Sequence, residues 1–203
     1  MGFLERLNDC GPVRWARSFG RKRDDGPAHQ LYVILAGQSR RPEFYLDGGA
    51  PDTLDGRFDM LALHLFLVLR RLSGQQASQA GKELSQQLFD VMFGDMDMNL
   101  REMGVGDLSV GKKIRSMSEA FYGRAAAYEK GLQTRDDTVL MDALQRNLFR
   151  GNPPSVAKLQ GLTHYVRSVE AALAGQSEAD LLTGKLSFPS VSEILRPIER
   201  GAP

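Results

Sequence analysis

A run of small and basic residues in the middle of the chain approaches the spacing of a phosphate-binding loop. Gly106 is followed after four residues by Gly111 and Lys112, as the GxxxxGK pattern requires. The next place holds Lys113, where a nucleotide-binding loop has the Ser or Thr that coordinates magnesium. The residues before the run predict a helix, whereas such a loop follows a strand. The run therefore indicates a junction between two helices, not a nucleotide site.

A second candidate is an acidic run that begins with Asp95 and Asp97, the carboxylate spacing that opens an EF-hand loop. That loop needs glycine at its sixth place and glutamate at its twelfth, but the chain has Leu100 and Gly106 there. On a helix Asp95 and Asn99 share a face, while Asp97 points elsewhere. These side chains indicate ion pairing or solvation and not a metal site.

Nucleophiles and metal-binding side chains are sparse. Cys10 is the single cysteine, which excludes an internal disulfide and Cys-rich zinc or iron–sulfur sites. The histidines, His29, His64 and His164, are far apart in sequence. His64 lies in an apolar segment, where a lone histidine is usually hydrogen-bonded and structural. With no recognisable grouping of nucleophile, base and orienting acid, the sequence predicts neither an enzyme nor a bound cofactor.

Charge gathers in the centre of the chain. Five acidic residues and one basic residue lie between Asp90 and Asp107, and a basic cluster follows at once. One hypothesis is a salt-bridge network in which Arg57, Arg101 and Arg124 hold these carboxylates and that of Asp59. The other is a charged face that binds a partner protein. The candidate partner-binding residues are Arg57, Asp59, Asp95, Asp97, Arg101, Glu102, Asp107, Lys112, Lys113, Arg115, Tyr122 and Arg124.

The elements that position these residues are predicted to be helices. Leucine occurs 27 times against 15 for valine and isoleucine together, and β-branched residues are what strands prefer. Apolar spacing and capping residues predict a compact, irregular all-α bundle of about six to seven helices. The expected helices cover residues 28–39, a short turn after Pro42, 51–72, about 82–103, 107–132, 136–150 and 156–175.

Three regions are expected along the chain: a flexible tail over 1–27, a single helical domain over 28–175, and a short helical turn with a loose tail over 176–203. The first tail combines arginines with scattered apolar side chains, the composition of a helix that lies on a membrane surface. A terminus that packs on the domain is the alternative. The candidate membrane-contact residues are Phe3, Leu4, Leu7, Trp15 and Phe19.

Net charge and hydropathy limit the location of the protein. The formal net charge is +1, which gives no global attraction to nucleic acid or anionic lipid. The longest apolar run, residues 60–69, is too short to cross a bilayer, which needs about 20 residues. No targeting segment is evident. We therefore expect a cytoplasmic monomer that is peripheral at the inner membrane, with no DNA partner.

Several strings together resemble the ubiquinol–cytochrome c chaperone family over about residues 30–150. They are Pro51-Asp52-Thr53, Asp55-Gly56-Arg57-Phe58-Asp59-Met60, Leu63-His64, Arg70-Arg71-Leu72, Leu88-Phe89-Asp90, Asp95-Met96-Asp97, residues 100–107, Phe121-Tyr122-Gly123-Arg124 and Ala127-Tyr128.

The resemblance implies an all-helical, non-catalytic assembly factor for respiratory complex III. It implies cytochrome b as the client, and mitochondrial members bind it near the ribosome together with a small partner protein. Because no mitochondrial presequence is evident, the chain looks like a bacterial member; in a eukaryote the expected site is the mitochondrial matrix. Two rivals stay open: a helical protein that binds a lipid or an isoprenoid, and a ribosome- or RNA-binding factor.

Overall fold

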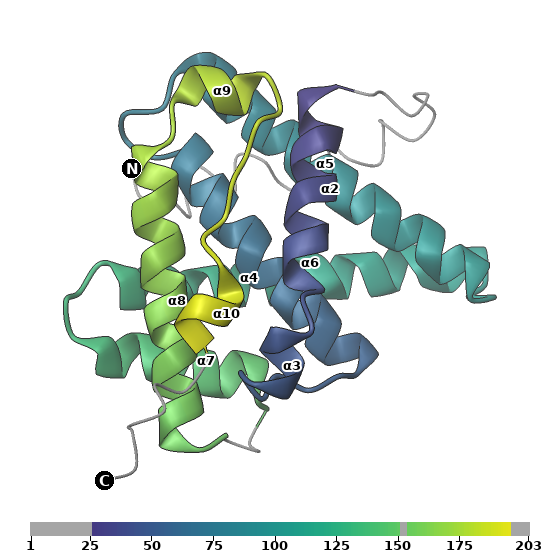
Figure 1. Cartoon of the computed structure of the whole chain (residues 1–203). Helices are drawn as coiled ribbons and strands as arrows, with labels where there is room; N and C mark the ends of the chain where they lie inside the picture. The colour runs from purple at the N-terminus through teal and green to yellow at the C-terminus, as the bar shows by residue number, and fades with distance from the viewer. Residues whose placement is uncertain (1–25, 151–153, 196–203) are drawn as a thin grey trace, which may run out of the picture.

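The computed structural model describes residues 26–150 and 154–195, and the regular structure within them is entirely helical (Figure 1). The helices are α2 (Pro27–Ser39), α3 (Glu43–Leu46), α4 (Leu54–Leu72), α5 (Gln79–Glu102), α6 (Asp107–Leu132), α7 (Asp137–Leu148), α8 (Val156–Gly175), α9 (Glu178–Leu182) and α10 (Val191–Leu195). The all-α prediction is confirmed. Within the described ranges six helices are long, and α3, α9 and α10 are single short turns.

Helix α4 forms the centre of the bundle. Residues 60–69 are each at most 6% exposed, and α2, α5, α6, α7 and α8 all contact this helix. A helix that is apolar on every face can be stable only if neighbours surround it. Burying each leucine-sized side chain contributes about 2 kcal/mol, so α4 carries much of the hydrophobic stabilisation.

Side chains cap the starts of several helices. Thr53, Ser78 and Asp136 each accept a hydrogen bond through the side chain from a backbone N–H two or three residues later. Such a bond satisfies one of the unpaired amides of the first turn. Helix α6 begins at Asp107 as expected, but its cap position is occupied by Gly106, which has no side-chain bond to offer. Asp107 lies in the first turn, where its charge favours the helix dipole.

Helices α5 and α6 form a long antiparallel hairpin. Its turn includes Gly104, whose φ of 82° lies in the left-handed region that glycine adopts without strain. In Figure 1 this turn lies at the right edge, beyond α2. From Met98 to Ser109 no side chain is buried. The end of the hairpin therefore extends beyond the core that holds the rest of the two helices.

The chain after α8 is packed as far as Leu195, in contrast to the loose tail expected from residue 176. Leu181 and Val191 have no exposed surface, and Leu195 is 8% exposed. Helix α10 packs against α3 and α8, and α9 against α5. The apolar side chains of these short helices cover the bundle, which explains their order despite Pro189.

The candidate membrane-contact residues Phe3, Leu4, Leu7, Trp15 and Phe19 lie outside the described residues. In the part of the chain that the structure covers, no helix is long and apolar enough to span a membrane.

Candidate functional site

Two of the predicted partner-binding residues form a buried ion pair. Asp59 of α4 has no exposed surface, and its Oδ1 lies 2.7 Å from Nη2 of Arg124 on α6. Arg150 donates from Nε to Asp59 Oδ2 at 3.1 Å. Burial raises the pKa of the Asp59 carboxyl, while the two guanidinium groups oppose that rise. Asp59 and Arg124 thus join α4 to α6 and do not form an open binding surface.

Arg57 lies elsewhere, at the start of α4. Its Nε donates to Oδ1 of Asp52 at 2.6 Å, and its guanidinium lies 5.8 Å from the centre of the Tyr45 ring. Both charged side chains are more than half exposed. The structure does not bring Arg57 into the ion pairs of the hairpin.

On the hairpin, Arg101 connects the end of α5 to the start of α6. Arg101 Nε donates to Oδ2 of Asp97 at 2.6 Å, and Arg101 Nη1 pairs with Asp107 at the start of α6. Asp97 is 3% exposed, so its carboxylate needs this partner. The salt-bridge hypothesis is therefore confirmed for Arg101 and Arg124, whereas Arg57 pairs with Asp52 instead.

Asp95 connects the hairpin to α2. Its Oδ2 accepts a hydrogen bond of 2.5 Å from the Tyr32 hydroxyl, and Asn99 donates to the same oxygen at 3.1 Å. Burial and the Asp95 carboxylate both raise the pKa of the Tyr32 phenol, so it remains a donor. This contact adds a hydrogen bond to the packing of α2 on α5.

The remaining charged candidates stay exposed. Glu102, Lys112 and Lys113 lie at or near the hairpin turn, exposed to solvent. Arg115 pairs with Glu119 one turn along α6 at 3.0 Å, and both are mostly exposed. Such a pair contributes little to stability, so these side chains are available to a partner.

Apolar side chains are exposed beside these charges, although helical spacing alone gives no sign of it. Met98, Met103 and Leu108 are 45%, 60% and 100% exposed. Met103 continues the apolar spacing of α5, which predicts a buried position. Periodicity records which face is apolar but not where the bundle ends, and here the helix continues past its neighbours. Only the high exposure in the fold identifies this surface.

Helix glycines add a second feature of the hairpin. A Cβ placed at Gly94, Gly111 or Gly123 would meet nothing within 4 Å. By contrast, a Cβ at Gly131 would lie 2.8 Å from the Cα of Leu140, so that glycine is required by packing of α6 on α7. Each glycine inside a helix costs about 1 kcal/mol relative to alanine. The first three incur that cost without a packing contact and leave backbone uncovered.

Most other aromatic and methionine side chains belong to the core. Phe44, Phe121 and Met92 have no exposed surface, and Tyr122 stacks on Phe89 with ring centres 5.7 Å apart. Phe121 and Tyr122 pack on Phe89 within the hairpin, whereas Phe44 packs on His64 and Tyr165.

His64 is structural, as predicted. Its Nδ1 lies 2.8 Å from the Met60 carbonyl oxygen and its Nε2 lies 2.9 Å from the Tyr165 hydroxyl. Gln38 donates to that hydroxyl at 2.9 Å. The neutral ring therefore donates through Nδ1 and accepts through Nε2, and both nitrogens are satisfied without a ligand. Over residues 26–150 and 154–195 there is no group of three metal-binding side chains.

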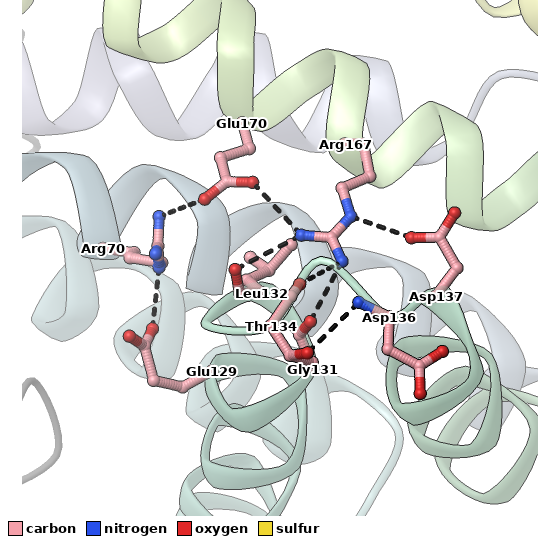
Figure 2. Close-up of polar contacts among 9 residues, drawn as sticks. All are labelled: Arg70, Glu129, Gly131, Leu132, Thr134, Asp136, Asp137, Arg167 and Glu170. Carbon is pink, nitrogen blue, oxygen red and sulfur yellow. Dashed lines mark hydrogen bonds and ion pairs between the residues drawn. The ribbon is translucent and has the colours of Figure 1, made fainter.

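A further set of charges lies at the C-terminal end of α6, away from the hairpin turn, and joins α6 to α4, α7 and α8 (Figure 2). Arg70 of α4 lies 2.7 Å from both Glu129 of α6 and Glu170 of α8. Arg167 of α8 donates to three backbone carbonyls at the end of α6 and to Asp137 of α7. Because all these groups are occupied within the fold, the cluster is structural. The end of the hairpin, by contrast, exposes both charged and apolar side chains.

Comparison with known proteins agrees with this arrangement. A family model described as ubiquinol-cytochrome C chaperone matches residues 46–188, further toward the C-terminus than the resemblance found in the sequence. Ubiquinol-cytochrome-c reductase complex assembly factor 1 of Xenopus laevis is 30% identical over 176 residues, which cover 84% of this chain and 86% of that protein. Its Drosophila melanogaster counterpart is 30% identical over 72% of this chain and 57% of its own length.

A solved structure is also similar. The crystal structure of the Cbp3 homolog from Brucella abortus superimposes with a TM-score of 0.74 and 33% identity, covering 83% of this chain and 91% of that one. The family match alone spans well over half of the chain. The chain therefore belongs to the ubiquinol-cytochrome c chaperone family, a family of assembly factors and not of enzymes.

Proposed function

We propose that the protein is a complex III assembly chaperone that binds cytochrome b, or a segment of it, on the α5–α6 hairpin. The contact face is formed by the exposed side chains between residues 95 and 119, and the aromatic side chains nearby support it from the core. The observation that carries the proposal is the combination of exposed Met98, Met103 and Leu108 with unpaired charges on a hairpin that extends beyond the core. Family membership supplies the link to complex III.

The chemistry of such a client matches this surface. Cytochrome b is a hydrophobic membrane protein, and its helices need cover before they are assembled. Methionine adapts to irregular apolar surfaces, and a charged rim orients a partner without large affinity of its own. The uncovered glycines Gly94 and Gly123 would let a client helix approach the backbone closely, as small residues do between membrane helices.

The protein is proposed to act at the cytoplasmic face of the membrane as a peripheral monomer. Contacts with a ribosome or a small partner protein, which the resemblance implies for mitochondrial members, remain predictions.

Site-specific photo-cross-linking in cells tests the client site. A photoreactive residue at Met98 or Lys112 should cross-link to cytochrome b, identified by mass spectrometry. The same group at Val156 of α8, which is 67% exposed, should not. Equal cross-linking yields from all three positions would contradict the proposed face. The absence of a cross-link to cytochrome b from positions 98 and 112 would also contradict it.

Charge reversal gives a second test. K112E/K113E should weaken recovery of cytochrome b from detergent-solubilised membranes, whereas K82E/K130E, which reverses two exposed lysines elsewhere, should not. Arg124 is unsuitable for reversal because a glutamate there would face the buried Asp59 carboxylate. Unchanged recovery with folded K112E/K113E counts against the charged part of the face.

A further inference from the structure

The last turn of α5, the connecting turn and the first turns of α6 form a distinct end of the hairpin. We call residues 98–113 the hairpin tip. It contains three of the exposed large apolar side chains of the described residues, Met98, Met103 and Leu108. The others, Val33, Leu46, Leu54 and Val156, are distributed over α2, α3, α4 and α8.

The exposure of the tip has no structural explanation within the fold. Single exposed apolar side chains are normal on a protein surface, but Leu108 is fully exposed at the end of a projecting hairpin and Met103 is 60% exposed beside it. Val110, two residues after Leu108, has no exposed surface and anchors the start of α6 to the core. The apolar residues of the tip are therefore held outward by a rigid base.

The charges of the tip complement an anionic surface. Between residues 98 and 113 the sequence has three basic and two acidic residues. Arg101 is shared by Asp97 and Asp107, whereas Glu102, Lys112 and Lys113 are exposed and together carry a net charge of +1. Lys112 lies one helical turn from Leu108 on the same face of α6, so an apolar group that enters a membrane interface brings a cation to the phosphates.

We propose that the hairpin tip docks on the surface of an anionic phospholipid bilayer, with Met103 and Leu108 inserted at headgroup level and Lys112 and Lys113 at the lipid phosphates. Interfacial segments bind in this way, by shallow burial of apolar side chains together with attraction to acidic lipid. The proposal uses side chains that also belong to the face proposed for the client, and it does not require a client to be bound. Docking of the tip would place the rest of the α5–α6 hairpin close to a membrane-inserted client.

The test is co-sedimentation of the full chain with vesicles of equal parts phosphatidylcholine and phosphatidylglycerol, and with vesicles of phosphatidylcholine alone. The wild-type protein should bind the acidic vesicles, and less in high salt. M103E/L108E should lower the partition coefficient at least about tenfold, because two apolar anchors become anions. K112E/K113E should lower it by a similar factor, since each lysine near an acidic surface is worth about fivefold.

The matched control is L46E/L54E, which adds the same two charges at residues 74% and 73% exposed on α3 and α4. It should bind as the wild type does. Failure of the wild type to bind, full binding by both tip variants, or equal loss in L46E/L54E would each overturn the proposal. Full binding by the tip variants would assign the lipid contact to another segment, such as residues 1–25.

A local reporter completes the experiment. A fluorophore that responds to polarity, attached at Leu108→Cys in a Cys10→Ser background, should shift to the blue with acidic vesicles. The same fluorophore at Leu54→Cys should not. Absence of a shift at position 108 contradicts insertion of the tip. Because the vesicles contain no protein, these results are independent of cytochrome b cross-linking, and either proposal can fail alone.

Discussion

Arg124 of α6 lies 2.7 Å from Asp59 of α4, a carboxylate with no exposed surface, and this pair ties the hairpin to the centre of the bundle. Each residue lies in one of the sequence segments that carry the family resemblance, but the contact between them has a structural role. A buried charge that loses its partner is left desolvated. Asp59 and Arg124 were both predicted to bind a partner, but their burial makes them inaccessible to one.

Replacing Arg124 with glutamine should therefore destabilise the fold. We expect a loss of about 3 kcal/mol in the free energy of unfolding, measured by urea denaturation, because the Asp59 carboxylate would lose its closest cation. Adding Asp59→Asn should restore part of the loss. Arg57→Gln, which removes an exposed pair, is the control and should cause little change. A near-neutral R124Q would mean that Arg150 or water satisfies Asp59.

The sequence predicts the helices well because their signals are local. The apolar run of α4 and the Thr53 cap define one helix without knowledge of the rest. The ends of α8 at Ser155 and Gly175 follow from the same rules. Short helices such as α10 contain too few residues to show a period, so the burial of Val191 was not predictable from pattern alone.

The candidate site was predictable only in part, because charge is visible in sequence and exposure is not. Asp59 and Lys112 look alike as charged residues, yet one is in the core and the other in solvent. Whether Leu108 is buried depends on how far α5 and α6 extend past α2. That is a property of the packed bundle, to which residues far apart in sequence contribute.

The buried His64 makes stability depend on pH. Burial lowers the pKa of its imidazole from 6.5 to about 4, with the Met60 carbonyl opposing the shift. Between these values the unfolded chain binds a proton that the folded chain excludes. The contribution of His64 is therefore fully present above about pH 6.5 and is lost as the pH falls toward 4, by about 3 kcal/mol.

Urea denaturation of the wild type and His64→Gln at several pH values isolates this effect from the other titrating groups. The difference in unfolding free energy between the two proteins should shrink as the pH is lowered from 7 to about 4.5. A difference that is constant with pH would show that the ring titrates normally in the folded protein.

Arg167 of α8 caps the C-terminal end of α6 by donating hydrogen bonds to its last carbonyl groups. Its guanidinium donates to the carbonyl oxygens of Gly131, Leu132 and Thr134 at 2.6–3.2 Å and also pairs with Asp137 (Figure 2). A lysine retains the charge but cannot reach the same acceptors with its single nitrogen. Arg167→Lys should thus lower the unfolding free energy by about 2 kcal/mol. Arg115→Lys in an exposed pair should leave thermal and urea midpoints nearly unchanged.

Substitutions at the uncovered glycines distinguish an effect on folding from an effect on client binding. Gly94→Ala and Gly123→Ala should each raise the unfolding free energy by up to about 1 kcal/mol, because alanine favours helix and the new methyl group meets nothing within 4 Å. If a client helix packs on this backbone, the same methyl groups should reduce cross-linking to cytochrome b several-fold. A more stable protein with weaker capture cannot be explained by misfolding.

Two further glycines serve as controls for that experiment. Gly37→Ala on α2 also adds a methyl group to open space, and it should stabilise the fold without changing capture. Gly131→Ala should instead destabilise by about 1–3 kcal/mol, since its Cβ would lie 2.8 Å from the Leu140 Cα. If Gly94→Ala and Gly123→Ala behave like Gly37→Ala in both measurements, the client does not approach the backbone of the hairpin. The exposed side chains of the face would then have to account for binding alone.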